Sequence, residues 1–237
     1  MGRFIKSAVG GLIAANALMF LLLHVAIAIW GATAADWFGI RASGPWLWTP
    51  LTYMFTNASV WDLLFNMLWL WLFSRIMLEF TSGGRLVAAY VVGGLAGAAT
   101  YLVAALAGMC GGVLFGASAA VIAIVVYGAV RVPYLKLNLM FFGAVSVKAI
   151  ALITVALSMI SFVAGNIGGG FAHLGGAVGG AVFALVDKRR RRFRIVKPAK
   201  NKGEKSLDEL LDKVRQSGYA SLTTDERRQL LDYSKRL

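Results

Sequence analysis

Two residues in apolar surroundings carry side chains suited to nucleophilic catalysis. Ser118 follows Gly116 and Ala117 at the start of one apolar segment, and His173 lies near the start of another. A histidine within hydrogen-bonding distance of a serine hydroxyl can take up its proton and activate it as a nucleophile. Polar side chains inside a membrane segment are costly, so each one marks a candidate functional site. Taken singly, a serine of this kind more often bonds to a carbonyl of its own helix, and a lone histidine often only packs.

The segments that carry these residues are typical of a membrane protein. Hydrophobic residues make up 59% of the 237 residues and charged residues 15%, whereas soluble domains are about one quarter charged. We predict an all-α polytopic membrane protein with six transmembrane helices in one bundle over residues 1–187, followed by a small helical tail. The six apolar segments cover residues 10–31, 59–80, 86–108, 115–132, 149–165 and 170–187.

The positions of the basic residues predict how the segments cross the membrane. The net charge is +13, but the cations gather in short turns and in the tail, which does not favour a nucleic-acid groove. With the N-terminus inside, almost all of them face the cytoplasm, as the positive-inside rule requires. We therefore expect a multi-pass protein of the inner cell membrane with both termini in the cytoplasm. The expected inner-side cations are Arg3, Lys6, Arg75, Arg85, Arg131, Lys136, Lys148 and the cluster at residues 188–194.

This topology brings the two polar residues to one level of the bundle. Both of their segments run from the outer to the inner side, so Ser118 and His173 should lie about one helical turn below the outer face, where water can reach them. Gly176 and Gly180 form a GxxxG pattern after the histidine, and Gly116 precedes the serine. Because small residues let helix backbones approach closely, a hydrogen bond between Ser118 and His173 is feasible.

Two connectors are long enough to have structure of their own. Residues 33–58 are rich in tryptophan, and we expect them to lie in the membrane interface because aromatic rings favour the headgroup region. In residues 131–148, apolar residues alternate with Lys136 and Asn138, which favours an extended or interfacial stretch. The alternative is that the fifth helix already begins at Leu139.

Residues 188–237 are predicted to be a basic linker followed by a helical hairpin. Ser206 and Glu209 fit a capping box at the start of a first helix, and Gly218 should end it. Thr224 is placed to cap a second helix. The hairpin would serve to solubilise the protein or to dock a partner, and the sequence leaves that partner open.

The motifs around the two polar residues resemble those of the rhomboid intramembrane serine proteases. Residues 116–119 are similar to the family's GxSG segment, and residues 172–180 are similar to its AHxxGxxxG motif. Residues 65–71 resemble its second-helix region and residues 45–55 its first loop. The resemblance covers residues 1 to about 187, and the tail looks like the extensions of some bacterial members.

The resemblance implies an activity and a role for each site residue. Ser118 would attack a peptide carbonyl of a transmembrane segment near the outer face, and His173 would pass its proton to the leaving amine. The backbone N–H of Ser118 and the side-chain amide of Asn66 would stabilise the oxyanion, and Gly116 would leave room for the substrate backbone. The implied protein is a serine endopeptidase of the bilayer that acts on transmembrane segments and needs neither cofactor nor metal nor nucleic acid.

One departure from the family pattern falls in the expected oxyanion site. Asp62 stands where the family has a histidine, and it shares a helix face with Asn66. An ionised carboxylate would repel an oxyanion, since two like charges about 4 Å apart cost roughly 4 kcal/mol at an effective dielectric near 20. Two hypotheses would reconcile Asp62 with catalysis: it is protonated and still donates, or it faces His173 as a carboxylate partner.

Other departures from the family pattern are compatible with a second function. Ala119 replaces the second glycine of GxSG, and Asn57 and Gly170 stand where relatives carry histidine. Such losses are compatible with a catalytically impaired rhomboid-like protein that binds membrane segments. A transporter would show paired intramembrane charges or broken helices in symmetric halves, and neither is visible in the sequence.

Overall fold

The computed structural model describes residues 8–139, 143–193 and 207–234. The contacts divide the chain into two compact units, residues 1–189 and residues 190–237. Each unit is described by itself.

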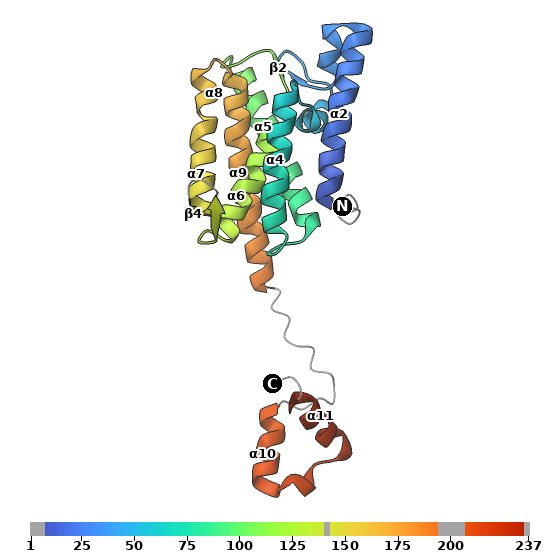
Figure 1. Cartoon of the computed structure of the whole chain (residues 1–237), viewed down its shortest axis with the longest axis vertical. Coiled ribbons are helices and arrows are strands. Elements are labelled where there is room, and N and C mark those ends of the chain that lie inside the picture. The colour runs from blue at the N-terminus through green and yellow to red at the C-terminus, as the bar shows by residue number, and fades with distance from the viewer. Residues whose placement is uncertain (1–7, 140–142, 194–206, 235–237) are drawn as a thin grey trace. The chain divides into compact units, whose positions relative to one another are not determined.

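The first unit is a bundle of helices that run side by side (Figure 1). Among the described residues, four helices are long and apolar enough to cross a membrane, and two apolar stretches are shorter. The chain is therefore a helical, polytopic membrane protein, and each of the six predicted segments overlaps helical residues. The helices are α2 (Ala8–Trp30), α4 (Val60–Met77), α5 (Gly83–Leu106), α6 (Ser118–Arg131), α7 (Val147–Ser158), α8 (Ile160–Val163) and α9 (Ile167–Phe193).

The helix boundaries follow from local chemistry. Helix α4 begins after Ser59, whose hydroxyl accepts a hydrogen bond from the backbone N–H of Asp62. Helix α6 begins only at Ser118, three residues later than predicted, because Gly116 has φ +129°, a value outside the helical region. Helix α9 begins at Ile167, earlier than predicted, because Asn166 caps it by accepting a hydrogen bond from Gly169 N–H at 2.9 Å.

The first long connector is folded against the segment that precedes Ser118. It contains η1 (Ala32–Trp37), β1 (Ile40–Arg41), α3 (Thr49–Thr52) and η2 (Tyr53–Phe55). Strand β1 pairs antiparallel with β2 (Val113–Leu114), and Gly116 N–H donates to the Tyr53 carbonyl. These bonds place the residues before Ser118 on a fixed backbone rather than on a free loop.

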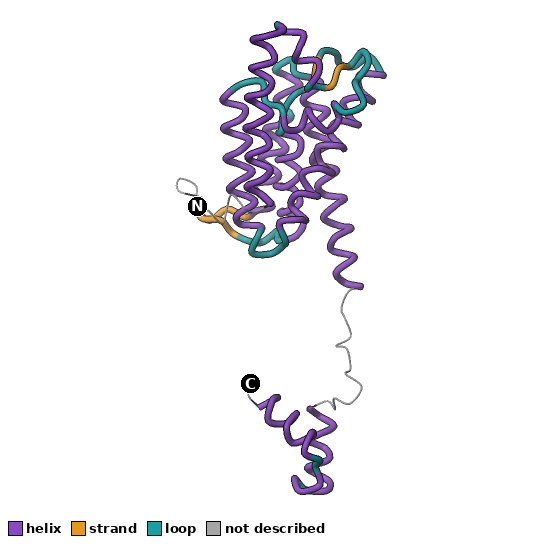
Figure 2. The backbone as a smooth tube through the Cα atoms, turned by 90° about the vertical axis from the view of Figure 1, so that its right-hand side faces the viewer, coloured by secondary structure: helices purple, strands orange, loops and turns teal. Residues whose placement is uncertain are grey.

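The second connector is extended, as predicted. Strands β3 (Lys136–Leu139) and β4 (Gly143–Ser146) form an antiparallel hairpin. The alternative, that the fifth helix begins at Leu139, is wrong, because that helix begins at Val147 after the Ser146 cap. Figure 2 shows the two small strand pairs at opposite ends of the bundle.

Small residues bring α6 and α9 into backbone contact, as the GxxxG pattern predicted. A Cβ atom at Gly176 would lie 2.2 Å from the Ala119 carbonyl oxygen, and one at Gly180 would lie 2.4 Å from the Ala123 carbonyl oxygen. The Ala119 methyl group, which the family motif lacks, lies opposite Gly97 of α5, where a Cβ atom would come within 2.8 Å of it. The extra methyl is thus accommodated by a glycine on the neighbouring helix.

The second unit is a helical hairpin, with α10 (Leu207–Ser217), η3 (Tyr219–Ser221) and α11 (Thr224–Ser234). Gly218, at φ +76°, ends α10 as predicted. The cap of α11 is Thr223 rather than Thr224: Thr223 N–H donates to the Glu226 carboxylate at 2.8 Å, and Glu226 N–H donates to the Thr223 hydroxyl. A capping box needs the carboxylate three residues after the cap, and only Thr223 has that spacing. The predicted box at Ser206 lies outside the described residues.

Candidate active site

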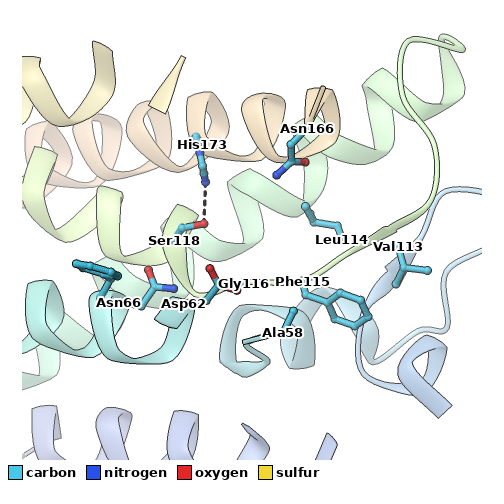
Figure 3. Close-up of a pocket in the computed structure, with 11 residues that line it drawn as sticks. Ala58, Asp62, Asn66, Val113, Leu114, Phe115, Gly116, Ser118, Asn166 and His173 are labelled. Carbon is cyan, nitrogen blue, oxygen red and sulfur yellow. Dashed lines mark hydrogen bonds between the residues drawn. The ribbon is translucent and has the colours of Figure 1, made fainter. Parts of the chain in front are cut away.

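A pocket of about 400 Å³ opens at the end of the bundle where α4, α6 and α9 meet the first connector. Its walls combine polar side chains with apolar ones such as Phe65 and Leu114. The five site residues singled out in the sequence all line it: Ser118, His173, Asn66, Gly116 and Asp62. Figure 3 shows Ser118 between His173 on one side and Asn66 and Asp62 on the other.

Ser118 and His173 are directly hydrogen-bonded. Ser118 Oγ lies 2.7 Å from His173 Nε2 (Figure 3), although the two residues are 55 positions apart in the sequence. The serine hydroxyl is therefore bonded to the histidine rather than to a carbonyl of its own helix. The hydrogen bond that the matching depths predicted is present.

Ser118 lies at the very start of its helix, whereas the apolar segment predicted from the sequence began at residue 115. Ser118 is the first residue of α6, with Ala117 as its cap. The first N–H groups of an α-helix have no acceptor within the helix, and the helix dipole makes this end attractive to negative charge. The backbone N–H of Ser118 is therefore a candidate oxyanion donor by its position alone.

Gly116 has a backbone conformation that favours glycine, and it lies next to the Ser118 hydroxyl. Its φ of +129° is one that residues with a side chain rarely adopt, and a Cβ atom there would lie 3.4 Å from Ser118 Oγ. A larger residue would strain the turn and crowd the serine hydroxyl.

The second nitrogen of the His173 ring, Nδ1, has different surroundings from Nε2. Nδ1 is buried and makes no hydrogen bond of standard geometry among the described residues. The backbone of Ser158, in α7, interacts with the ring without forming such a bond. The Ser118–His173 pair therefore has no carboxylate that orients the histidine within the described part of the chain.

Asp62 is engaged elsewhere, so the hypothesis that it is the partner of His173 is wrong. Its Oδ2 atom accepts hydrogen bonds from the Ser59 hydroxyl at 2.7 Å and from the Ser59 backbone N–H at 3.2 Å. The spacing of Ser59 and Asp62 is that of a capping box at the start of α4. That spacing is readable in the sequence. Asp62 Oδ2 is an acceptor here, not the donor that a histidine would provide.

Asn66 takes part in a buried network that the sequence analysis also missed. Its Nδ2 atom donates to Asn57 Oδ1 at 2.9 Å, and Asn57 donates in turn to Asn16 of α2. Asn16 and Asn57 are both completely buried. An asparagine inside the first apolar segment was the available signal, since polar groups in membrane segments need partners.

Two further residues lie at or near the start of α9. Gly170 cannot become histidine without a rearrangement, because a Cβ atom there would lie 2.7 Å from the Phe162 ring. Asn166, which was not among the predicted site residues, lines the pocket from the start of α9.

Within the described residues, no group of three or more His, Cys, Asp or Glu side chains could hold a metal ion.

The comparisons with known proteins agree with this architecture. Residues 196–236 match the model of a family of unknown function, DUF6576, which coincides with the helical hairpin. A search of curated proteins found no match to this chain. Residues 45–190, more than half of the chain, match the model of the Rhomboid domain. The chain therefore belongs to the rhomboid family.

Proposed function

We propose that the protein is a serine endopeptidase that cleaves transmembrane segments of other proteins within the bilayer, near its outer face. The hydrogen bond of 2.7 Å between Ser118 Oγ and His173 Nε2 carries this proposal. At this distance the imidazole can take the hydroxyl proton as the nucleophile attacks. The geometry joins two helices at one pocket, and membership of the rhomboid family makes intramembrane proteolysis the expected activity.

The reaction follows from the positions of the side chains. Ser118 Oγ attacks the carbonyl carbon of the scissile peptide bond while its proton passes to His173 Nε2. The oxyanion of the tetrahedral intermediate is held by the Ser118 backbone N–H and by Asn66 Nδ2. His173 then protonates the leaving amine, the C–N bond breaks, and an acyl ester remains on Ser118. Water, with His173 again as the base, hydrolyses the ester and restores the serine.

The orientation in the membrane is part of the proposal. Ser118 and Arg131 are the first and last residues of α6, so the pocket lies at the end opposite to that basic residue. By the positive-inside rule, the Arg131 end faces the cytoplasm and the pocket faces the outer side of the inner membrane. Both termini are then cytoplasmic, and water reaches Ser118 from outside while substrates enter laterally from the lipid.

Asp62 does not prevent this chemistry. Because its Oδ2 atom already accepts two hydrogen bonds from Ser59, part of its negative charge is stabilised away from the oxyanion. Asp62 is also exposed at the pocket, and solvent screening lowers its repulsion well below the value for a buried pair of charges. The alternative, an impaired protein that only binds membrane segments, is not favoured because the Ser118–His173 bond is intact.

Labelling with a fluorophosphonate probe tests the proposal on the full-length protein in liposomes. We expect covalent labelling and cleavage of a reporter transmembrane segment, both abolished by Ser118→Ala. Ser74→Ala is the matched control, because Ser74 is a buried membrane serine in α4 outside the pocket, and it should retain both signals. Absence of Ser118-dependent labelling and cleavage would refute the protease proposal.

A further inference from the structure

A continuous chain of hydrogen bonds leads from the pocket into the interior of the bundle. Asn66 Nδ2 donates to Asn57 Oδ1 at 2.9 Å, Asn57 Nδ2 donates to Asn16 Oδ1 at 3.2 Å, and Asn16 Nδ2 donates to Tyr90 Oη at 3.0 Å. The three residues beyond Asn66 are completely buried. The chain joins α4, the first connector, α2 and α5, and Asn66 is its one member that lines the pocket.

The far end of the chain determines which way each amide points. Asn16 Nδ2 also donates to the backbone carbonyl of Leu12 at 2.9 Å. A carbonyl oxygen can only accept, so Asn16 must turn its NH₂ group toward Leu12 and its oxygen toward Asn57. Asn57 must then present its NH₂ group to Asn16 and its oxygen to Asn66. Consequently, Asn66 is held with its NH₂ group, not its oxygen, toward Asn57.

Tyr90 reinforces this direction. Its hydroxyl donates to the backbone carbonyl of Met54, so its oxygen is left to accept from the NH₂ group of Asn16. The backbone carbonyls of Leu12 and Met54 thus fix the donor-to-acceptor direction of every hydrogen bond in the network. Reversing any one amide would place two donors or two acceptors against each other in a buried site, which is costly.

We propose that Asn57 is a positioning residue for the oxyanion donor Asn66. An amide nitrogen carries two N–H groups; one is held by Asn57 Oδ1, and the second is left to serve the oxyanion. Donors that are oriented before the reaction stabilise a developing charge most effectively. A freely rotating Asn66 would instead present its oxygen to the oxyanion in part of the molecules, next to the carboxylate of Asp62. This inference rests on the proposed protease function.

A double-mutant cycle on the full-length protein in liposomes tests the inference. We expect Asn57→Leu to lower kcat for a reporter substrate by about 10²-fold, the usual effect of losing one oxyanion donor, with a much smaller change in KM. In an Asn66→Ala background the same change should lower kcat by less than about threefold, because coupled residues are non-additive. A general structural role would reduce kcat equally in both backgrounds, and that result would overturn the inference.

A conservative variant keeps the test decisive if Asn57→Leu does not fold. Asn57→Asp has the same shape and, in its neutral form, can accept from Asn66 and donate to Asn16. It should retain more of the wild-type kcat than Asn57→Leu, and any loss should again disappear in the Asn66→Ala background. A loss of kcat that persists in the Asn66→Ala background would contradict the inference. If the wild-type protein shows no Ser118-dependent cleavage, the proposed function itself is refuted.

Discussion

Two polar clusters lie at opposite ends of the same bundle, and their partners are distributed very differently. At one end the buried Asp187 of α9 accepts hydrogen bonds from Arg85 Nε at 2.9 Å and Tyr127 Oη at 3.0 Å, and it pairs with Arg131 at 3.7 Å. The Tyr127 hydroxyl also bonds to Thr81 at 2.9 Å. Both carboxylate oxygens of Asp187 therefore have partners from α5 and α6.

The cluster around Ser118 is incomplete by comparison. His173 Nδ1 has no standard hydrogen bond among the described residues, and the first N–H groups of α6 lie at an open pocket. A saturated buried cluster holds helices together, whereas unused donors at a pocket are available to a ligand. From this difference we predict that mutations at the Asp187 end change stability and that mutations at the Ser118 end change the proposed cleavage activity.

The largest expected effect is on activity at the Ser118 end. His173→Phe, which keeps a ring in the cavity, should lower the cleavage rate by at least about 10⁴-fold because the general base is lost. The free energy of unfolding should change by less than about 1 kcal/mol, since the ring makes few structural hydrogen bonds. Reporter cleavage and unfolding in detergent measure the two quantities. Appreciable remaining activity would show that His173 is not the base.

Asp187→Ala should have the opposite profile. Removing the carboxylate leaves Arg85 and Arg131 without their shared partner, which should lower the free energy of unfolding by about 3–5 kcal/mol. The rate per folded molecule, counted by Ser118 labelling, should stay near wild type. Asp36→Ala is the matched control, because the Asp36–Arg41 pair of 2.8 Å, in which Arg41 is exposed and Asp36 half-buried, should contribute less than about 1 kcal/mol. Equal losses in the two variants would remove the distinction between the clusters.

Asp62→His tests whether the pocket lacks a donor. We expect the cleavage rate to be preserved or raised, by up to about tenfold, since a carboxylate gives way to a possible donor. Loss of the capping box should lower the free energy of unfolding by about 1 kcal/mol. Asp62→Asn separates the two effects, because asparagine removes the charge and still caps. A strong fall in the rate of both variants would show that the carboxylate itself is required.

The smallest effect is expected for Tyr127→Phe. Its hydroxyl bonds to Asp187 and Thr81, so its loss should lower the free energy of unfolding by about 1 kcal/mol without changing the cleavage rate. Tyr134→Phe serves as the control, because Tyr134 is 86% exposed. A reduced rate in Tyr127→Phe would mean that the two ends of the bundle are coupled.

Much of the fold was predictable because membrane helices are determined by local hydropathy. Each of the six apolar segments overlaps helical residues, and the alternation around Lys136 predicted an extended stretch. The helical hairpin was also predicted, apart from the shift of its cap to Thr223. Boundaries were less reliable: the start of α6 depends on the φ angle of Gly116, which the stretch of apolar residues does not reveal.

The candidate site was predictable only where short motifs carry it. Ser118 and His173 were found because each lies in a compact pattern of small residues, and the helix packing that joins them follows from Gly176. The hypothesis that Asp62 faces His173 was wrong because the partner of a carboxylate depends on its rotamer, and Ser59 three residues earlier binds it. The hydrogen bond between Ser118 and His173 is observed. The catalytic roles of these two residues stay predictions.

By itself, the sequence determined the helical class, the apolar segments and the identity of the Ser118–His173 pair, since hydropathy and motif spacing are local properties. Only the tertiary structure decided that Asn16, Asn57 and Asn66 form one directed chain. These residues lie on α2, on a connector and on α4, and a hydrogen bond over a few ångströms exists only once those elements pack. The orientation of the Asn66 amide is therefore a property of the packed bundle and not of any one segment.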